Sequence, residues 1–174
     1  LEDERGNRYE IKFDGYNYPE LRTSAEVIST KFFYASGYNV PETAIIYFDP
    51  KRLAIRDSVR IRDGRTRRNL VMADVRNALE ERPRDRFGNV RAIAIKFVEG
   101  APMGPWMFEG TRSDDPNDRV AHEHRRELRG LRVISSWLND TDRRDLNTLA
   151  VYTDEGYVKH YFNDFGSTLG ANGI

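Results

Sequence analysis

Short segments in which hydrophobic and polar residues alternate predict a protein rich in β-strands. The alternation is clearest over residues 8–14, and residues 43–48 and 90–98 are apolar enough to form buried strands. Further along, residues 148–152 and 157–162 are strand-like and are separated by Asp-Glu-Gly, a turn sequence. The last two strands are therefore expected to form a hairpin.

The longest helical pattern in the N-terminal half covers residues 24–36. Thr23 followed by Glu26 fits a capping box at the start of this helix, and Gly37 is a natural stop. The apolar face of the helix is expected to consist of Ile28, Phe32 and Ala35.

A second long helix is expected to begin at residues 114–116 and to continue to residue 138. Its buried stripe is expected to consist of Leu128, Leu131, Ile134 and Leu138. A short helix is expected over residues 74–81, where it ends before a proline.

These elements suggest two regions, with a boundary after residue 98. Residues 1–98 are expected to form a sheet-rich region with one main helix, and residues 49–89 are an elaboration of that region. Residues 99–106 carry two glycines and two prolines and should leave the sheet. Residues 99–174 then hold the long helix and the final hairpin. The fold class is therefore α+β.

Composition limits the classes of function. The 174 residues include 28 basic and 28 acidic side chains, so we expect no DNA partner, although a local basic patch remains open. The absence of cysteine excludes disulfides, zinc–thiolate sites and thiol nucleophiles. No apolar run approaches the ~18 residues of a membrane span, so no span is expected. The chain starts with Leu1 and no signal-peptide pattern, so we expect it to begin inside a longer protein.

Polar residues gather at both ends of the predicted final hairpin. Asn147 precedes it and Asp164 follows it, and a hairpin returns the chain to its starting point, so the two should be close. Together with Asp142 they offer the oxygen ligands that Mg²⁺ prefers. The order Asp-x-x-x-x-Asn, hairpin, Asp-Phe-Gly is the arrangement used for phosphoryl transfer.

With these motifs the sequence resembles the atypical branch of the protein-kinase-like superfamily, namely HipA-type kinases and phosphoinositide-type lipid kinases. Their catalytic loop reads roughly Asp-Arg-His-x-x-Asn, and residues 142–147 read Asp-Arg-Arg-Asp-Leu-Asn, with arginine replacing histidine. The segment YEIKFD resembles the strand with the ATP-anchoring lysine. SAEVISTKFFYASGYNVPE resembles the helix whose glutamate pairs with that lysine, and KFVEGAPMG resembles the hinge that contacts adenine.

The resemblance implies a sheet-rich N-lobe, a hinge and the first part of a helical C-lobe. It also implies an ATP- and Mg²⁺-dependent phosphotransferase that acts on a hydroxyl of an unidentified protein or small molecule. A bacterial cytoplasmic location is favoured. No glycine-rich loop precedes the lysine strand and the helical lobe is incomplete, so these residues alone are expected to be inactive. The implied roles are Asp142 as base, Asn147 and Asp164 as metal ligands, and Lys12, Glu26, Val98 and Glu99 at the nucleotide.

Each candidate also has a structural interpretation. Lys12 would fit a solvent-facing position on its strand, and Glu26 would fit a pure capping role that excludes pairing with Lys12. Asp142 and Asn147 are residue types common in turns. The alternative bases are Asp140 and Asp145. Two alternatives of function also stay open: a non-catalytic, pseudokinase-like module that binds a nucleotide or a protein, and a nucleotidyl transferase.

Other charged residues are expected to be structural. Arg143 and Arg144 are expected to pair with nearby carboxylates rather than to bind phosphate. His122 and His124 are two residues apart, so a regular helix would point them in different directions and they would not share a zinc ion. The arginine-rich segment 125–132 is interleaved with acid and is expected to be a solvated face.

Overall fold

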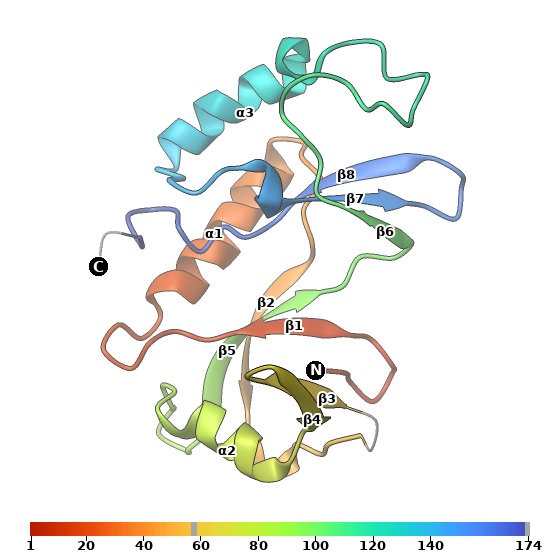
Figure 1. Ribbon diagram of the computed structural model, residues 1–174. Coiled ribbons are helices and arrows are strands. Elements are labelled where there is room, and N and C mark those ends of the chain that lie inside the picture. The colour runs from red at the N-terminus through yellow and green to blue at the C-terminus, as the bar shows by residue number, and fades with distance from the viewer. Residues whose placement is uncertain (57–58, 173–174) are drawn as a thin grey trace.

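The computed structural model describes residues 1–56 and 59–172 (Figure 1). Within these residues the protein has a mixed α+β architecture with three small antiparallel sheets and three α-helices. The predicted α+β class is therefore confirmed.

The first sheet has the order β1-β5-β2, and all its pairs are antiparallel. β5 (Val90–Lys96) is the central strand and is buried from Val90 to Ile95, Arg91 included. β1 (Tyr9–Lys12) and β2 (Thr43–Phe48) flank it, and Lys12 and Ile45 both lie opposite Ile93. All three strands lie within the predicted segments.

The second sheet has the order β6-β7-β8 and contains the predicted hairpin. β7 (Thr148–Tyr152) and β8 (Val158–Phe162) pair antiparallel. β6 (Ala101–Gly104) is the other edge strand. The prediction that residues 99–106 leave the sheet holds only for the first sheet, because part of this segment joins the second. An edge strand accepts Pro102 because its missing N–H is not needed for pairing on both sides.

Helix α1 (Leu21–Ala35) begins earlier than predicted, and the capping box is wrong. Thr23 lies inside the helix, and its N–H donates to the Asp14 carboxylate at 3.0 Å. The N–H of Glu20 donates to the other oxygen of Asp14, also at 3.0 Å. A carboxylate from the preceding loop thus caps this helix, which leaves Glu26 available for another partner. Gly37 ends the helix in the left-handed region (φ 89°), as predicted.

The buried face of α1 is not the predicted apolar one. Ile28 and Phe32 are 44% and 41% exposed, whereas Ser29 and Phe33 are fully buried. The Ser29 hydroxyl shares a hydrogen bond of 2.7 Å with Thr168, and Phe33 stacks on Phe165 with ring centroids 4.6 Å apart. The helix therefore faces the segment that follows Asp164, and small polar side chains suit that close contact.

Helix α3 (Arg126–Trp137) is shorter than predicted because its expected start at residue 114 is wrong. Residues 114–121 form turns, and Asn117 N–H donates to the Asp115 side chain at 2.9 Å. Asp and Asn favour such local bonds over helix, which explains the late start. A short 3₁₀ turn, η2 (His122–His124), precedes the helix. The predicted stripe is confirmed, with Leu128, Leu131 and Leu138 buried and Ile134 packed against them.

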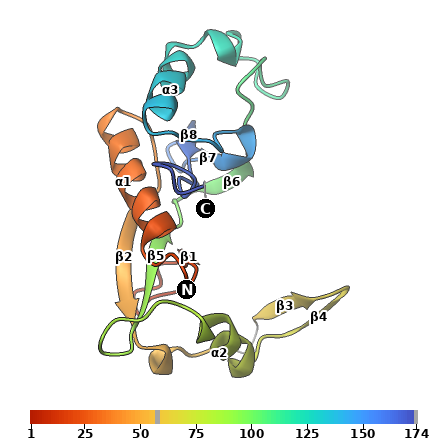
Figure 2. The same ribbon diagram turned by 90° about the vertical axis from the view of Figure 1, so that its left-hand side faces the viewer.

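Residues 49–89 lie below the first sheet in Figure 1. They contain η1 (Pro50–Arg52), the two-stranded ribbon of β3 (Arg60–Asp63) and β4 (Thr66–Asn69), and α2 (Met72–Glu80). Figure 2 shows the ribbon projecting from the rest of the molecule.

The main core lies between α1, α3 and the second sheet, so α1 connects the two halves of the chain (Figure 2). Its buried members include Phe33, Trp106, Leu131, Phe162 and Phe165. None of the described helices is long and apolar enough to cross a bilayer.

Gly100 lies in the single connection between the two sheets and is required there by geometry. A Cβ at this position would lie 2.5 Å from the carbonyl oxygen of Tyr152 and 2.7 Å from Val151 Cγ1, and φ is 109°. We expect Gly100→Ala to lower the free energy of unfolding by about 3 kcal/mol, from backbone strain plus the clash. Gly37→Ala is the matched control, because φ is 89° but nothing lies within 4 Å. Equal losses in denaturant titrations of the two variants would contradict the clash.

Candidate nucleotide site

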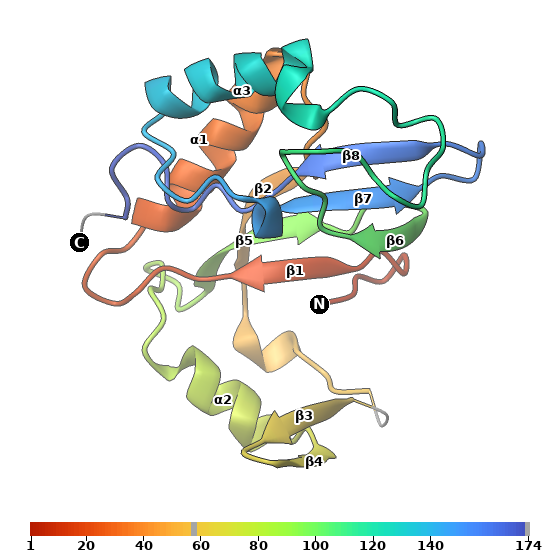
Figure 3. The ribbon, with the colours of Figure 1, turned by 45° about the horizontal axis from the view of Figure 1, so that its top comes forward.

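A cleft of about 380 Å³ lies between the two sheets. Figure 3 shows β1 of the first sheet facing β6 and β7 of the second across this region. Four of the seven predicted site residues line it: Lys12, Val98, Asn147 and Asp164. The cleft therefore brings together side chains that are up to 152 positions apart in the sequence.

Lys12 joins α1 to the segment after the hairpin through two carboxylates. Its Nζ lies 3.1 Å and 3.2 Å from the two oxygens of Glu26 and 2.9 Å from Oδ1 of Asp164. The Glu26 side chain is only 4% exposed, whereas that of Asp164 is 50% exposed. Of the two interpretations of Glu26, pairing with Lys12 is thus the one observed. Lys12 points into the cleft and not to open solvent.

Burial and pairing act in opposite directions on these groups. Burial disfavours the ammonium form of Lys12, but the facing carboxylates of Glu26 and Asp164 outweigh it and raise the pKa of Lys12. Burial raises the pKa of the Glu26 carboxyl, and Lys12 offsets this only in part. Lys12 therefore stays charged, and its charge keeps the pKa of Glu26 below the value that burial alone would give.

The hairpin closes as predicted and brings Asp164 next to Asn147. Asn163 N–H donates to the carbonyl oxygen of Asn147 at 3.1 Å. Asp164 has φ of 56°, a left-handed conformation that is rare outside glycine and is held only where the surroundings enforce it. Gly166 allows the segment after Asp164 to pack closely against Glu26, because a Cβ at this position would lie 3.3 Å from Glu26 Oε2.

Arg143 holds this part of the chain together and does not face the cleft. Its Nη1 donates to the carbonyls of Asn147 and Asn163 at 3.0 Å and 2.8 Å, and its Nε donates to Asp140 at 2.8 Å. The guanidinium also lies 4.5 Å from the centre of the Phe165 ring. Arg144 pairs with Asp142 at 3.1 Å. The prediction that both arginines pair structurally with local carboxylates is confirmed.

Asp142 lies beside Asn147 but outside the set of residues that line the cleft. Asn147 Nδ2 donates to the backbone carbonyl of Asp142 at 2.6 Å and to its carboxylate at 3.2 Å. Asn147 belongs to the 3₁₀ turn η3 (Asp145–Asn147), so the turn interpretation of this residue is also correct. The Asp140 side chain is fully buried against Arg143, and Asp145 accepts a hydrogen bond from Phe108 N–H.

The oxygen atoms of Asn147 and Asp164 suit a hard cation such as Mg²⁺. Within residues 1–56 and 59–172, no side chain or backbone group donates to Asn147 Oδ1, and Lys12 engages only one oxygen of Asp164. The same residues contain no cluster of three or more His, Cys, Asp or Glu side chains that would hold a metal. Mg²⁺ commonly uses one or two protein ligands and takes the rest from phosphates and water, so this pair fits it.

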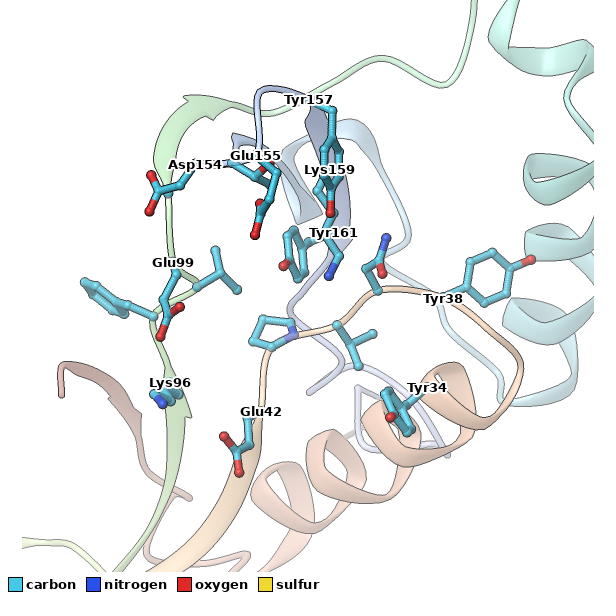
Figure 4. A pocket seen from close by; sticks show the side chains of 17 residues that line it. Tyr34, Tyr38, Glu42, Lys96, Glu99, Asp154, Glu155, Tyr157, Lys159 and Tyr161 are labelled. Atoms are coloured by element: carbon cyan, nitrogen blue, oxygen red, sulfur yellow. The ribbon is translucent and has the colours of Figure 1, made fainter.

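The Glu99 side chain does not join the candidate site. It points into a second cleft of about 380 Å³, on the other side of the connection between the sheets (Figure 4). Glu155 and Tyr161 of the hairpin side also point into this second cleft. Glu99 is therefore outside the set of residues that line the first cleft. The neighbouring Val98 lines both clefts.

Two features of the site were missed from the sequence. The apolar part of the cleft is formed by Ile95, Pro102, Leu146, Leu149 and Val151. The position of α1 depends on Arg91, whose Nη1 lies 2.8 Å from Asp14 in a pair that is 8% and 2% exposed. A single arginine in the otherwise apolar sequence of β5 is the signal that would have indicated a buried ion pair.

Removing the Lys12 charge should make stability depend on pH through Glu26. In Lys12→Met the buried carboxyl loses its cation, so its pKa rises further above its ordinary 4.5. When a carboxyl has a higher pKa in the folded protein than in the unfolded chain, the folded protein becomes less stable as the pH rises above the unfolded-state pKa. We therefore expect a deficit of about 2 kcal/mol at neutral pH that shrinks toward pH 4.5.

Denaturant titration at several pH values measures this deficit. Lys12→Met combined with Glu26→Gln should remove most of its pH dependence. Lys31→Met, on the exposed side of α1, is the matched control and should change stability by less than about 0.5 kcal/mol. If the loss of unfolding free energy in Lys12→Met did not vary with pH, the charge of Lys12 would have no effect on the pKa of Glu26.

A comparison of the chain with protein-family models, with curated proteins and with solved structures found no match.

Proposed function

We propose that this protein binds ATP with Mg²⁺ in the cleft between its two sheets and transfers a phosphoryl group to a hydroxyl of an acceptor. The observation that carries the proposal is the pair of contacts from Lys12 to Glu26 and Asp164, opposite Asn147 in one cleft. A site for a nucleoside triphosphate needs three kinds of group: a fixed ammonium, an amide and a carboxylate that bind the metal, and an apolar wall.

The charged residues have separate tasks in this proposal. Lys12, held by Glu26, neutralises phosphate oxygens, while Asn147 and Asp164 hold the metal through their free oxygens. Asp142 orients the acceptor hydroxyl and accepts its proton. The apolar wall formed by Ile95, Leu149 and Val151 receives the base. When bound, Mg²⁺ neutralises the charge that develops on the phosphates. Catalysis of this kind is mostly positioning and electrostatics.

Three contacts favour a second candidate, a non-catalytic module that binds a nucleotide or a protein. Asp164 is engaged by Lys12, and the carboxylate of Asp142 is engaged by Asn147 and Arg144. Activity requires that substrate and metal displace these contacts. A protein that keeps these contacts would bind a nucleotide or a protein without transferring a phosphoryl group.

Thermal unfolding with and without ATP and Mg²⁺ tests the binding step. At a ligand concentration of about 100 Kd, binding adds about 2.7 kcal/mol and should raise the Tm by several degrees. Asp164→Ala should lose this shift, and so should the wild type in the presence of EDTA. Asp154→Ala, in the turn of the β7–β8 hairpin, is the matched control and should keep it.

Equal shifts in wild type and Asp164→Ala would refute the metal–nucleotide assignment. Incubation of the full-length protein with ATP labelled at the α- or γ-phosphate then separates the candidate functions. Transfer of the γ label identifies a phosphotransferase, transfer of the α label identifies a nucleotidyl transferase, and binding without transfer identifies a non-catalytic module.

A further inference from the structure

Basic charge is concentrated in the elaboration of the first sheet. Residues 49–89 contain 12 basic and seven acidic side chains, and 11 of the basic ones are arginine. Because the whole chain has a formal charge of zero, the remaining residues carry an excess of acid. No DNA partner was expected because the net charge of the whole chain is zero, but that sum conceals a strongly basic region.

The β3–β4 ribbon sorts its arginines onto one face. Residues that lie directly opposite each other in an antiparallel pair share a face, and Arg62 lies opposite Arg67. Arg60 is two positions from Arg62 and therefore lies on the same face. All three side chains are exposed. Figure 2 shows that the ribbon projects from the molecule, so this face is accessible.

The opposite face of the ribbon is tied to the rest of the fold. Arg68 makes two hydrogen bonds of 2.7 Å to Asp74 of α2 and a third of 2.7 Å to Asp63. The hydrogen bonds from Arg68 hold the pKa of Asp74 at about 2. Arg68 thus fixes the ribbon, and Arg60, Arg62 and Arg67 lie on its other face.

The three outward arginines have no acidic partner within residues 1–56 and 59–172. Arg60 donates to the backbone carbonyl of Arg67 at 3.2 Å, and Arg62 donates to that of Gly64 at 3.1 Å. Like charges placed opposite each other destabilise a strand pair. An external anion would relieve this repulsion.

We propose that the β3–β4 ribbon is a binding element for the phosphate backbone of a nucleic acid. A two-stranded ribbon fits the major groove of a duplex, and guanidinium groups bind phosphates in a bidentate manner. The tip, residues 63–66, reads Asp-Gly-Arg-Thr and has no apolar side chain to insert into a bilayer. The basic residues on this face are arginines and not lysines, which favours phosphate as the ligand because a guanidinium matches the geometry of a phosphate and an ammonium is only a point charge.

Fluorescence anisotropy tests this with labelled duplex DNA, duplex RNA and single-stranded RNA, each measured over a range of salt concentrations. The test variant carries Arg60→Ala, Arg62→Ala and Arg67→Ala. The control variant carries Arg126→Ala, Arg129→Ala and Arg132→Ala on exposed positions of α3, so it loses the same charge. Unfolding curves of both variants confirm that each is folded.

We expect the wild type to bind at low salt and the ribbon variant to bind at least about 10-fold more weakly. The slope of log K against log salt should fall in magnitude by about 2.7 for duplex DNA and by about 2 for single strands. The α3 variant should keep the wild-type slope. Whichever of the three nucleic acids binds most tightly identifies the physiological class.

Three results would overturn the proposal. The first is no binding of any nucleic acid at low salt, and the second is an equal loss in both variants. The third is binding of polyglutamate or of vesicles containing anionic lipid as tightly as nucleic acid, with the same loss in the ribbon variant. That result would identify an acidic protein or a membrane surface as the partner.

Discussion

Replacing Asp14 with alanine is expected to destabilise this protein more than any other single change considered. Its carboxylate accepts four hydrogen bonds: two from the N–H groups of Glu20 and Thr23, one from the Thr23 hydroxyl and one from Arg91. Asp14→Ala leaves the buried Arg91 without a counter-charge and α1 without its cap. Breaking such a pair from one side costs about 3–5 kcal/mol, measured as the free energy of unfolding.

A double variant separates the two contributions. Asp14→Ala with Arg91→Leu removes both charges, so it should recover part of the lost stability, because the unpaired charge is then gone. The remaining deficit measures the loss of the helix cap, about 1 kcal/mol. If the double variant were as unstable as the sum of the single ones, the ion pair between Asp14 and Arg91 would have no coupling energy.

The second large effect is expected in Asp142→Asn, on the rate of phosphoryl transfer and not on the stability of the fold. Asp142→Asn keeps the size of the side chain and its place beside Asn147 but removes the carboxylate that is the proposed base. We expect the rate of phosphoryl transfer by the full-length protein to fall about 10²- to 10⁴-fold. The thermal shift with ATP and Mg²⁺ should remain, because Asn147 and Asp164 are unchanged.

Asp154→Asn is the control for this variant, because it makes the same change on an exposed turn outside the cleft. Its transfer rate should equal that of the wild type. An undiminished rate in Asp142→Asn would exclude Asp142 as the base and direct attention to Asp140 and Asp145.

The sequence was informative where a local pattern fixes the structure. Strands β2, β5, β7 and β8 lie within or close to their predicted limits because continuous or alternating apolar residues need one buried face. The proximity of Asn147 and Asp164 followed from hairpin geometry alone. The stripe of α3 followed from helical spacing, which survives an error in where the helix begins.

Predictions failed where distant residues compete for the same groups. Glu26 is a plausible cap in its own sequence, but Asp14 supplies the cap and Lys12 takes the glutamate. Ile28 and Phe32 have the right spacing for a buried face, yet the segment after Asp164 packs on the other side of α1. Periodicity cannot show which of two helix faces will pack against a segment that lies 139 residues later in the chain.

The amino-acid sequence by itself determined the α+β class, the final hairpin and the types of side chain available for phosphate and metal. Those depend on spacing between near neighbours, which is a property of the chain. Only the tertiary structure decided that Lys12 contacts Asp164, that Glu99 points into the other cleft, and that Arg62 and Arg67 lie opposite each other on one face of the ribbon. These are outcomes of long-range packing, in which burial selects one arrangement among several that local preferences allow.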